Sequence, residues 1–69
     1  MKATIKFEVN GKKTQKTIEV TKNEPNSIIR ELAKIDKRIY KHTYITTIKC
    51  GRTEYQWFGK AGEAGVGEY

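Results

Sequence analysis

The sequence predicts an α+β domain in which one helix packs across one face of a four-stranded mixed sheet. Three features predict it: alternating apolar and polar residues near the start, an amphipathic helical pattern in the middle, and two segments rich in β-branched and aromatic residues around a glycine-containing break. A chain of 69 residues suffices for one domain, and its elements follow in the order ββαββ.

The first two strands are expected to form a hairpin. Apolar side chains recur at every second position, namely Ala3, Ile5, Phe7 and Val9. Asn10–Lys13 is expected to form a four-residue loop before a strand over Thr14–Val20, because this register sets Ile5 against Ile18. The alternative, a two-residue turn at Asn10-Gly11, would set Ile5 against Lys16.

A helix is expected next, with Pro25 in its first turn and Asn23 as the N-cap. The apolar side chains recur at spacings of four, three and four, which predicts a core-facing stripe of Ile28, Leu32, Ile35 and Ile39. We expect the helix to end near Lys41–Thr43, where cations suit the negative end of the helix dipole.

Tyr44–Cys50 and Thr53–Phe58 are expected to form a second hairpin around a two-residue Gly51-Arg52 turn. In this register the inward-facing side chains are Tyr44, Ile48, Tyr55 and Trp57. The same register places Ile45 opposite Phe58 on the outer face of the sheet, as an apolar cross-strand pair.

Residues 1–58 are expected to make up the domain, and residues 59–69 a flexible tail, because they contain four glycines and no periodicity. In an alternative interpretation, Val66 and Tyr69 fold back to cover the Ile45–Phe58 pair.

A helix crossing between two hairpins favours the spatial strand order 2-1-4-3, with the first and last strands parallel. The alternative places the second hairpin differently and gives an all-antiparallel meander with the helix on top. The element order, the Asn10-Gly11-Lys12 turn and the single crossing helix resemble the β-grasp fold of protein G-type and ubiquitin-like domains. The resemblance covers about residues 2 to 58. It implies the fold and assigns no binding residue, since β-grasp members have unrelated functions.

Charge and composition limit the class of protein. The 14 Lys and Arg residues against 8 Asp and Glu residues give a formal net charge of +6. The longest apolar runs are two residues, such as Ile28-Ile29, so no membrane span is expected. A single cysteine and a polar, alternating start predict a cytoplasmic protein and not a disulfide-stapled secreted one.

The leading functional prediction is a small binding or regulatory module that contacts DNA or RNA. Basic residues recur on the helix face opposite the apolar stripe, and they are Arg30, Lys34, Lys37, Arg38 and Lys41. Such a ridge would contact phosphates with little sequence preference and strong salt dependence.

The alternative function is a protein–protein interaction module, such as an inhibitor or adaptor of a phage or mobile element, that binds an acidic protein surface. It would use an exposed edge strand, Thr14–Val20 or Tyr44–Cys50, or the outer-face pair of Ile45 and Phe58.

Enzymatic activity is not expected, nor is a small-molecule substrate. Cys50 and His42 are the only conventional nucleophile and base, and they fall near opposite ends of one predicted strand. Two such ligands are too few for a structural zinc site, and no glycine-rich loop precedes the helix, so neither a metal nor a cofactor is expected.

Overall fold

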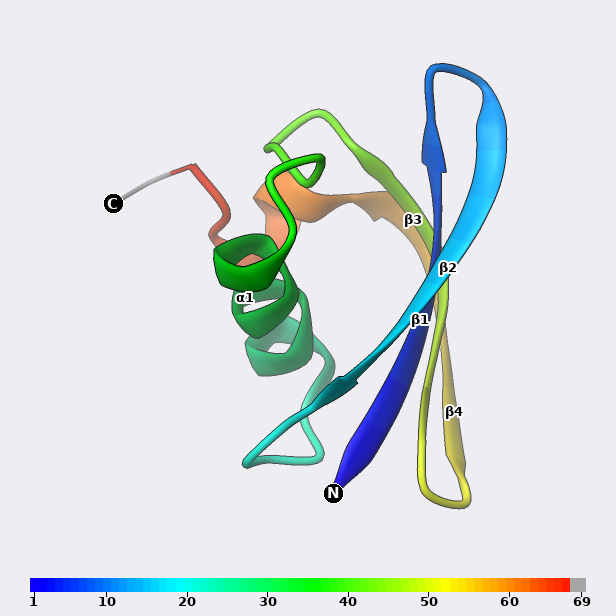
Figure 1. The fold of residues 1–69 in the computed structure, drawn as a ribbon, viewed down its shortest axis with the longest axis vertical. Coiled ribbons are helices and arrows are strands. Elements are labelled where there is room, and N and C mark those ends of the chain that lie inside the picture. The colour runs from blue at the N-terminus through cyan, green and yellow to red at the C-terminus, as the bar shows by residue number, and fades with distance from the viewer. Residues whose placement is uncertain (68–69) are drawn as a thin grey trace.

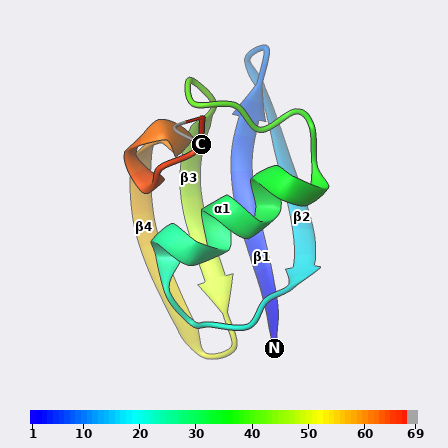
Figure 2. The ribbon, with the colours of Figure 1, turned by 90° about the vertical axis from the view of Figure 1, so that its left-hand side faces the viewer.

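The computed structural model describes residues 1–67 and confirms the α+β class. Its elements are β1 (Lys2–Val9), β2 (Lys12–Glu19), α1 (Pro25–Ile35), β3 (Tyr44–Cys50), β4 (Thr53–Lys60) and a short 3₁₀ helix, η1 (Ala61–Ala64). Helix α1 lies across one face of the four-stranded sheet, and the other face is uncovered (Figures 1 and 2). None of the helices within residues 1–67 is long and apolar enough to cross a membrane.

The strand order is β2-β1-β3-β4 and every pairing is antiparallel, so the predicted order 2-1-4-3 and the β-grasp arrangement are wrong. Burial explains the choice of central strand. Strand β3 contributes three fully buried side chains, Ile45, Ile48 and Cys50, whereas Tyr55 and Trp57 of β4 are only half-buried. The more aliphatic strand therefore occupies the position under the helix. The sheet edges are β2, as predicted, and β4, whereas Tyr44–Cys50 lies inside the sheet.

The first hairpin turns through two residues, Asn10 and Gly11, so the predicted four-residue loop is wrong. Their φ angles of 51° and 80° suit the tight turns whose twist matches that of paired strands. Ile5 consequently pairs with Lys16, and Ala3 pairs with Ile18. Since the two registers differ by two residues, every side chain keeps its face, and burial alone does not discriminate between them.

The second hairpin has the predicted turn and register near Gly51-Arg52, but a β-bulge changes the register further along. Ile48 pairs with Tyr55 as expected, whereas Ile45 pairs with Gly59. The bulge turns Ile45 inward, where it is 0% exposed, so its prediction as an outer-face residue is wrong. Phe58 is 59% exposed and adopts a left-handed φ of 43° at the bulge. Tyr44, predicted to face inward, is exposed.

Helix α1 begins with Pro25 at the first turn and buries Ile28, Ile29 and Leu32. Its N-cap is Glu24 and not Asn23, whose side chain instead accepts a hydrogen bond from the Tyr55 hydroxyl at 2.8 Å. The helix ends at Ile35, about two turns before the predicted end.

The C-terminal segment packs on the domain as far as residue 67, so the prediction of a flexible tail from residue 59 is wrong for residues 59–67. Strand β4 extends to Lys60, and the side chains of Ala61, Ala64 and Val66 are buried on the helix side of the sheet. The backbone N–H of Gly62 donates to the Lys41 carbonyl at 2.9 Å. Val66 therefore does not cover Phe58 on the outer face, and the prediction for Tyr69 lies outside the described residues.

Candidate functional site

The segment of residues 36–43 links α1 to β3 and crosses the end of the sheet where the β1–β2 turn lies (Figure 2). It contains both buried polar residues of the described chain, Asp36 and Thr43. Buried polar groups need hydrogen-bond partners, and these two side chains find theirs within the same segment. We call residues 36–43 the braced loop.

Asp36 ends the helix by binding the residue two positions ahead. Its Oδ1 accepts the Arg38 backbone N–H at 3.0 Å, and its Oδ2 accepts Arg38 Nη2 at 2.7 Å. Such side-chain bonds compete with helix continuation. The hydrogen bonds from Arg38 hold the pKa of Asp36 at about 2, despite the opposing effect of burial. The Arg38 guanidinium also lies 5.5 Å from the centre of the Phe7 ring.

Thr43 closes the other end of the braced loop. Its hydroxyl donates to the Arg38 carbonyl at 3.2 Å and accepts the Tyr40 backbone N–H at 2.9 Å. Its backbone N–H donates to the Tyr40 carbonyl at 3.0 Å, and its carbonyl accepts the Ala61 N–H at 2.8 Å. The loop is thus fixed from both ends and from η1, which lowers the entropic cost of presenting its exposed side chains to a ligand.

The exposed side chains of this region are cationic and aromatic. Tyr40 is 58% exposed, and its ring lies parallel to that of His42, with centroids 5.8 Å apart and planes within 5°. Lys34 in the last helical turn and Lys37 and Lys41 in the loop are exposed, and within residues 1–67 none of the three forms a salt bridge. The loop cluster, as we call it, consists of Lys34, Lys37, Tyr40, Lys41 and His42.

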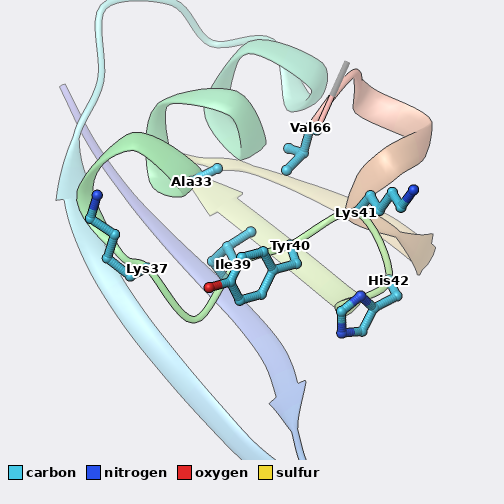
Figure 3. A pocket seen from close by; sticks show the side chains of 8 residues that line it. Ala33, Lys37, Ile39, Tyr40, Lys41, His42 and Val66 are labelled. Atoms are coloured by element: carbon cyan, nitrogen blue, oxygen red, sulfur yellow. The ribbon is translucent and has the colours of Figure 1, made fainter. Parts of the chain in front are cut away.

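A hollow of about 450 Å³ lies between the braced loop, helix α1 and the C-terminal segment. Ala33, Ile39 and Val66 supply its apolar wall. Figure 3 shows Lys37 and Lys41 on opposite sides of the hollow with the Tyr40 ring between them. The hollow combines an apolar wall, an exposed aromatic ring and two lysine side chains, which suits a ligand with a flat apolar part and negative charge.

The five predicted nucleic-acid-binding residues do not form one helical ridge. Lys37, Arg38 and Lys41 lie beyond the helix, in the braced loop. In the apolar stripe, Ile35 is 56% exposed, so its predicted core-facing position is wrong, whereas Ile39 is buried as predicted, at 4% exposed, but from the loop. Because the helix ends at Ile35, the later basic residues do not continue the predicted helical ridge.

The two arginines of the predicted set make structural contacts. Arg30 Nη1 donates to the Ala64 carbonyl at 2.7 Å and so ties α1 to η1. Arg38 is paired with Asp36, which compensates its charge locally. The three lysines remain as candidate ligand contacts.

Of the two residues predicted to bind a partner on the outer face, Phe58 lies exposed there, whereas Ile45 is buried on the other face. Phe58 borders a second hollow of about 500 Å³, together with Lys6, Lys13 and Glu54. These side chains carry both signs of charge, so this surface has less preference for a polyanion than the loop cluster.

Cys50 and His42 do not come together. Cys50 is 1% exposed at the end of β3, and His42 is exposed before the start of the same strand. Within residues 1–67, no three potential metal ligands gather at one place.

Tyr40, His42 and Val66 belong to this region but were not among the predicted site residues. Tyr40 and His42 stand among lysines in a segment interpreted as helix, where basic residues interleaved with aromatics were themselves a usable signal. Nothing in the sequence around Val66 indicates that it packs beside Ala33 and Ile39.

Comparison of the chain with protein-family models, with curated proteins and with solved structures finds no match.

Proposed function

We propose that this protein is a small nucleic-acid-binding module whose phosphate contacts come from Lys34, Lys37 and Lys41. One observation carries the proposal: three exposed lysines that form no salt bridge with any group of residues 1–67 stand beside an exposed Tyr40–His42 ring pair on a braced loop. Cationic side chains beside exposed aromatic rings are the combination that binds nucleic-acid backbones and bases.

Two features favour this surface over the other charged surfaces of the domain. The negative charge of Asp36 is compensated by Arg38, and the Glu63 carboxylate accepts the Lys60 N–H at 2.7 Å. On the outer face, by contrast, Lys49 pairs across strands with Glu54, and Lys13 with Glu8. The proposal includes the cytoplasmic location expected from the sequence, where DNA and RNA are both accessible.

Binding titrations over a range of salt concentrations test the proposal. The logarithm of the binding constant for a labelled single strand should fall linearly with the logarithm of salt concentration. The slope of this line should be about −0.7 for each phosphate that the protein neutralises. The Lys37→Gln/Lys41→Gln variant should weaken binding and reduce that slope by about 1.4.

Lys22→Gln/Lys49→Gln is the matched control, because it removes the same charge from two exposed positions outside the loop cluster. Equal weakening by both double variants would show that net charge, and not this cluster, determines binding. Absence of binding at micromolar protein in low salt would reject the proposal.

A second candidate function is recognition of an acidic protein surface through Phe58 and edge strand β2. The exposure of Phe58, in a backbone conformation that bulky residues rarely adopt, favours it. Capture experiments from host lysate with wild-type protein and Phe58→Asp test this candidate, and a partner lost only from the variant would support it.

A further inference from the structure

We infer that the hollow beside the braced loop receives one unpaired base, so that the protein selects single-stranded over double-stranded nucleic acid. This inference rests on the proposed function, because the phosphates on either side of the base would contact Lys37 and Lys41. The inference specifies single-stranded nucleic acid as the ligand, which the charges of the lysines alone do not.

The shape and lining of the hollow support a base as the occupant. Its volume of about 450 Å³ falls in the range of about 300–1,000 Å³ typical of small-ligand sites. Ala33, Ile39 and Val66 form the apolar wall, and each of Ile39 and Val66 is at most 4% exposed, so these two side chains are held by the packing of the core. A rigid apolar wall favours a flat, weakly hydrated group over a phosphate.

The aromatic pair supports stacking at the mouth of the hollow. Tyr40 is held by its own backbone, through its N–H to the Thr43 hydroxyl and its carbonyl to the Thr43 N–H. Its ring is oriented parallel to the His42 ring. A ring that is already oriented loses little freedom when a base stacks on it, and every base offers a π-face, so the contact tolerates any sequence.

The positions of the two lysines favour a base within a nucleic-acid strand over a free base as the ligand. Lys37 and Lys41 lie on opposite sides of the hollow (Figure 3). Phosphates precede and follow each nucleotide of a strand, so two flexible lysine side chains on opposite sides of the hollow complement a base that is part of a chain. A base within a duplex is stacked and paired, and must be extruded at a cost before it reaches such a hollow.

The test compares wild-type protein and variants on three ligands in low salt by fluorescence anisotropy. The ligands are a labelled single strand of about twelve nucleotides, the same strand with abasic residues, and a duplex of the same sequence. Tyr40→Ala removes the ring and Tyr40→Phe preserves it. Phe58→Asn is the matched control, because it removes an equally exposed ring from the outer face and suits a left-handed backbone.

Wild-type protein should bind the normal single strand about 5- to 150-fold more tightly than the abasic strand, and Tyr40→Ala should lose that advantage. Tyr40→Phe and Phe58→Asn should retain it. The abasic arm uses unmodified protein, so it decides the question even if Tyr40→Ala folds poorly.

The failures of the two proposals are distinguishable. Salt-dependent binding with equal affinity for normal strand, abasic strand and duplex would overturn the single-strand inference and leave the phosphate contacts intact. Absence of binding to all three ligands would reject the proposed function and this inference together.

Discussion

Replacing Asp36 by Asn should destabilise the protein at neutral pH and have little effect in strong acid. The Asn side chain keeps an oxygen that can accept the Arg38 backbone N–H, but it lacks the negative charge that the guanidinium contacts at 2.7 Å. The substitution therefore isolates the charge of the carboxylate from its hydrogen-bond geometry.

The magnitude follows from the pKa of Asp36, which is about 2 in the folded protein against an ordinary value of 3.8. At about 1.36 kcal/mol per pKa unit, the charge would stabilise the fold by somewhat over 2 kcal/mol. The Arg38 side chain is 49% exposed, so solvent screens part of this energy, and we expect a loss of about 1–2 kcal/mol in the variant.

The sign of the pH dependence is fixed because the folded-state pKa is the lower one. The stabilisation by Asp36 is complete above the unfolded-state pKa and is lost as the pH falls through about 2. Urea unfolding followed by Trp57 fluorescence at about pH 6 and about pH 2 should therefore show a gap between wild type and variant that closes in acid.

Glu24→Gln serves as the control, because it also removes one negative charge, but from an exposed position without a side-chain cap hydrogen bond. A gap for Asp36→Asn that is the same at both pH values would refute the reasoning. The cause would then be altered packing or hydrogen bonding in the braced loop and not the charge.

Four further substitutions test the bulge, the first turn and the docking of the C-terminal segment, each by urea unfolding. Ile45→Ala should cost about 2–5 kcal/mol because the side chain is fully buried, whereas Phe58→Ala should cost less than about 1 kcal/mol; comparable losses would contradict the bulged register. Gly11→Ala should cost about 1 kcal/mol because the residue has a φ of 80°, and a neutral effect would argue against the two-residue turn. Gly62→Ala should cost about 1–3 kcal/mol because the added methyl would lie 2.9 Å from the Lys41 carbonyl oxygen, and an unchanged midpoint would mean that the segment does not dock there.

Local sequence patterns predicted the elements that depend on neighbouring residues. The alternation in β1, the Gly51-Arg52 turn and the burial of Ile28 and Leu32 each follow from a short window of sequence, and each is confirmed. Strand order was not predictable in this way. Either strand of the second hairpin can lie beside β1, β3 antiparallel to it or β4 parallel to it, and the choice depends on which one buries more aliphatic surface.

The end of α1 could not be predicted because apolar spacing continues past it. Ile39 is placed where a longer helix would bury it, and the loop buries it equally well. The helix stops where Asp36 and Thr43 make hydrogen bonds to backbone groups, in a loop that also contacts Phe7 and η1, which are distant in the sequence. The candidate site was misplaced for the same reason, since two of the three lysines follow this break.

The left-handed conformation of Phe58 connects the bulge to the candidate site. That conformation costs roughly 1–2 kcal/mol for a residue with a side chain, and in a regular ladder Phe58 would not need it. Without the bulge, however, Ile45 would face water on the outer side of the sheet, and burying such a side chain is worth about 1.5–3 kcal/mol. The bulge also sets the direction in which Gly59 and Lys60 lead into η1, whose Ala61 N–H binds the Thr43 carbonyl at 2.8 Å. The strain at Phe58 is therefore offset by burial of Ile45 and of the C-terminal segment, and that same segment supplies one wall of the hollow through Val66.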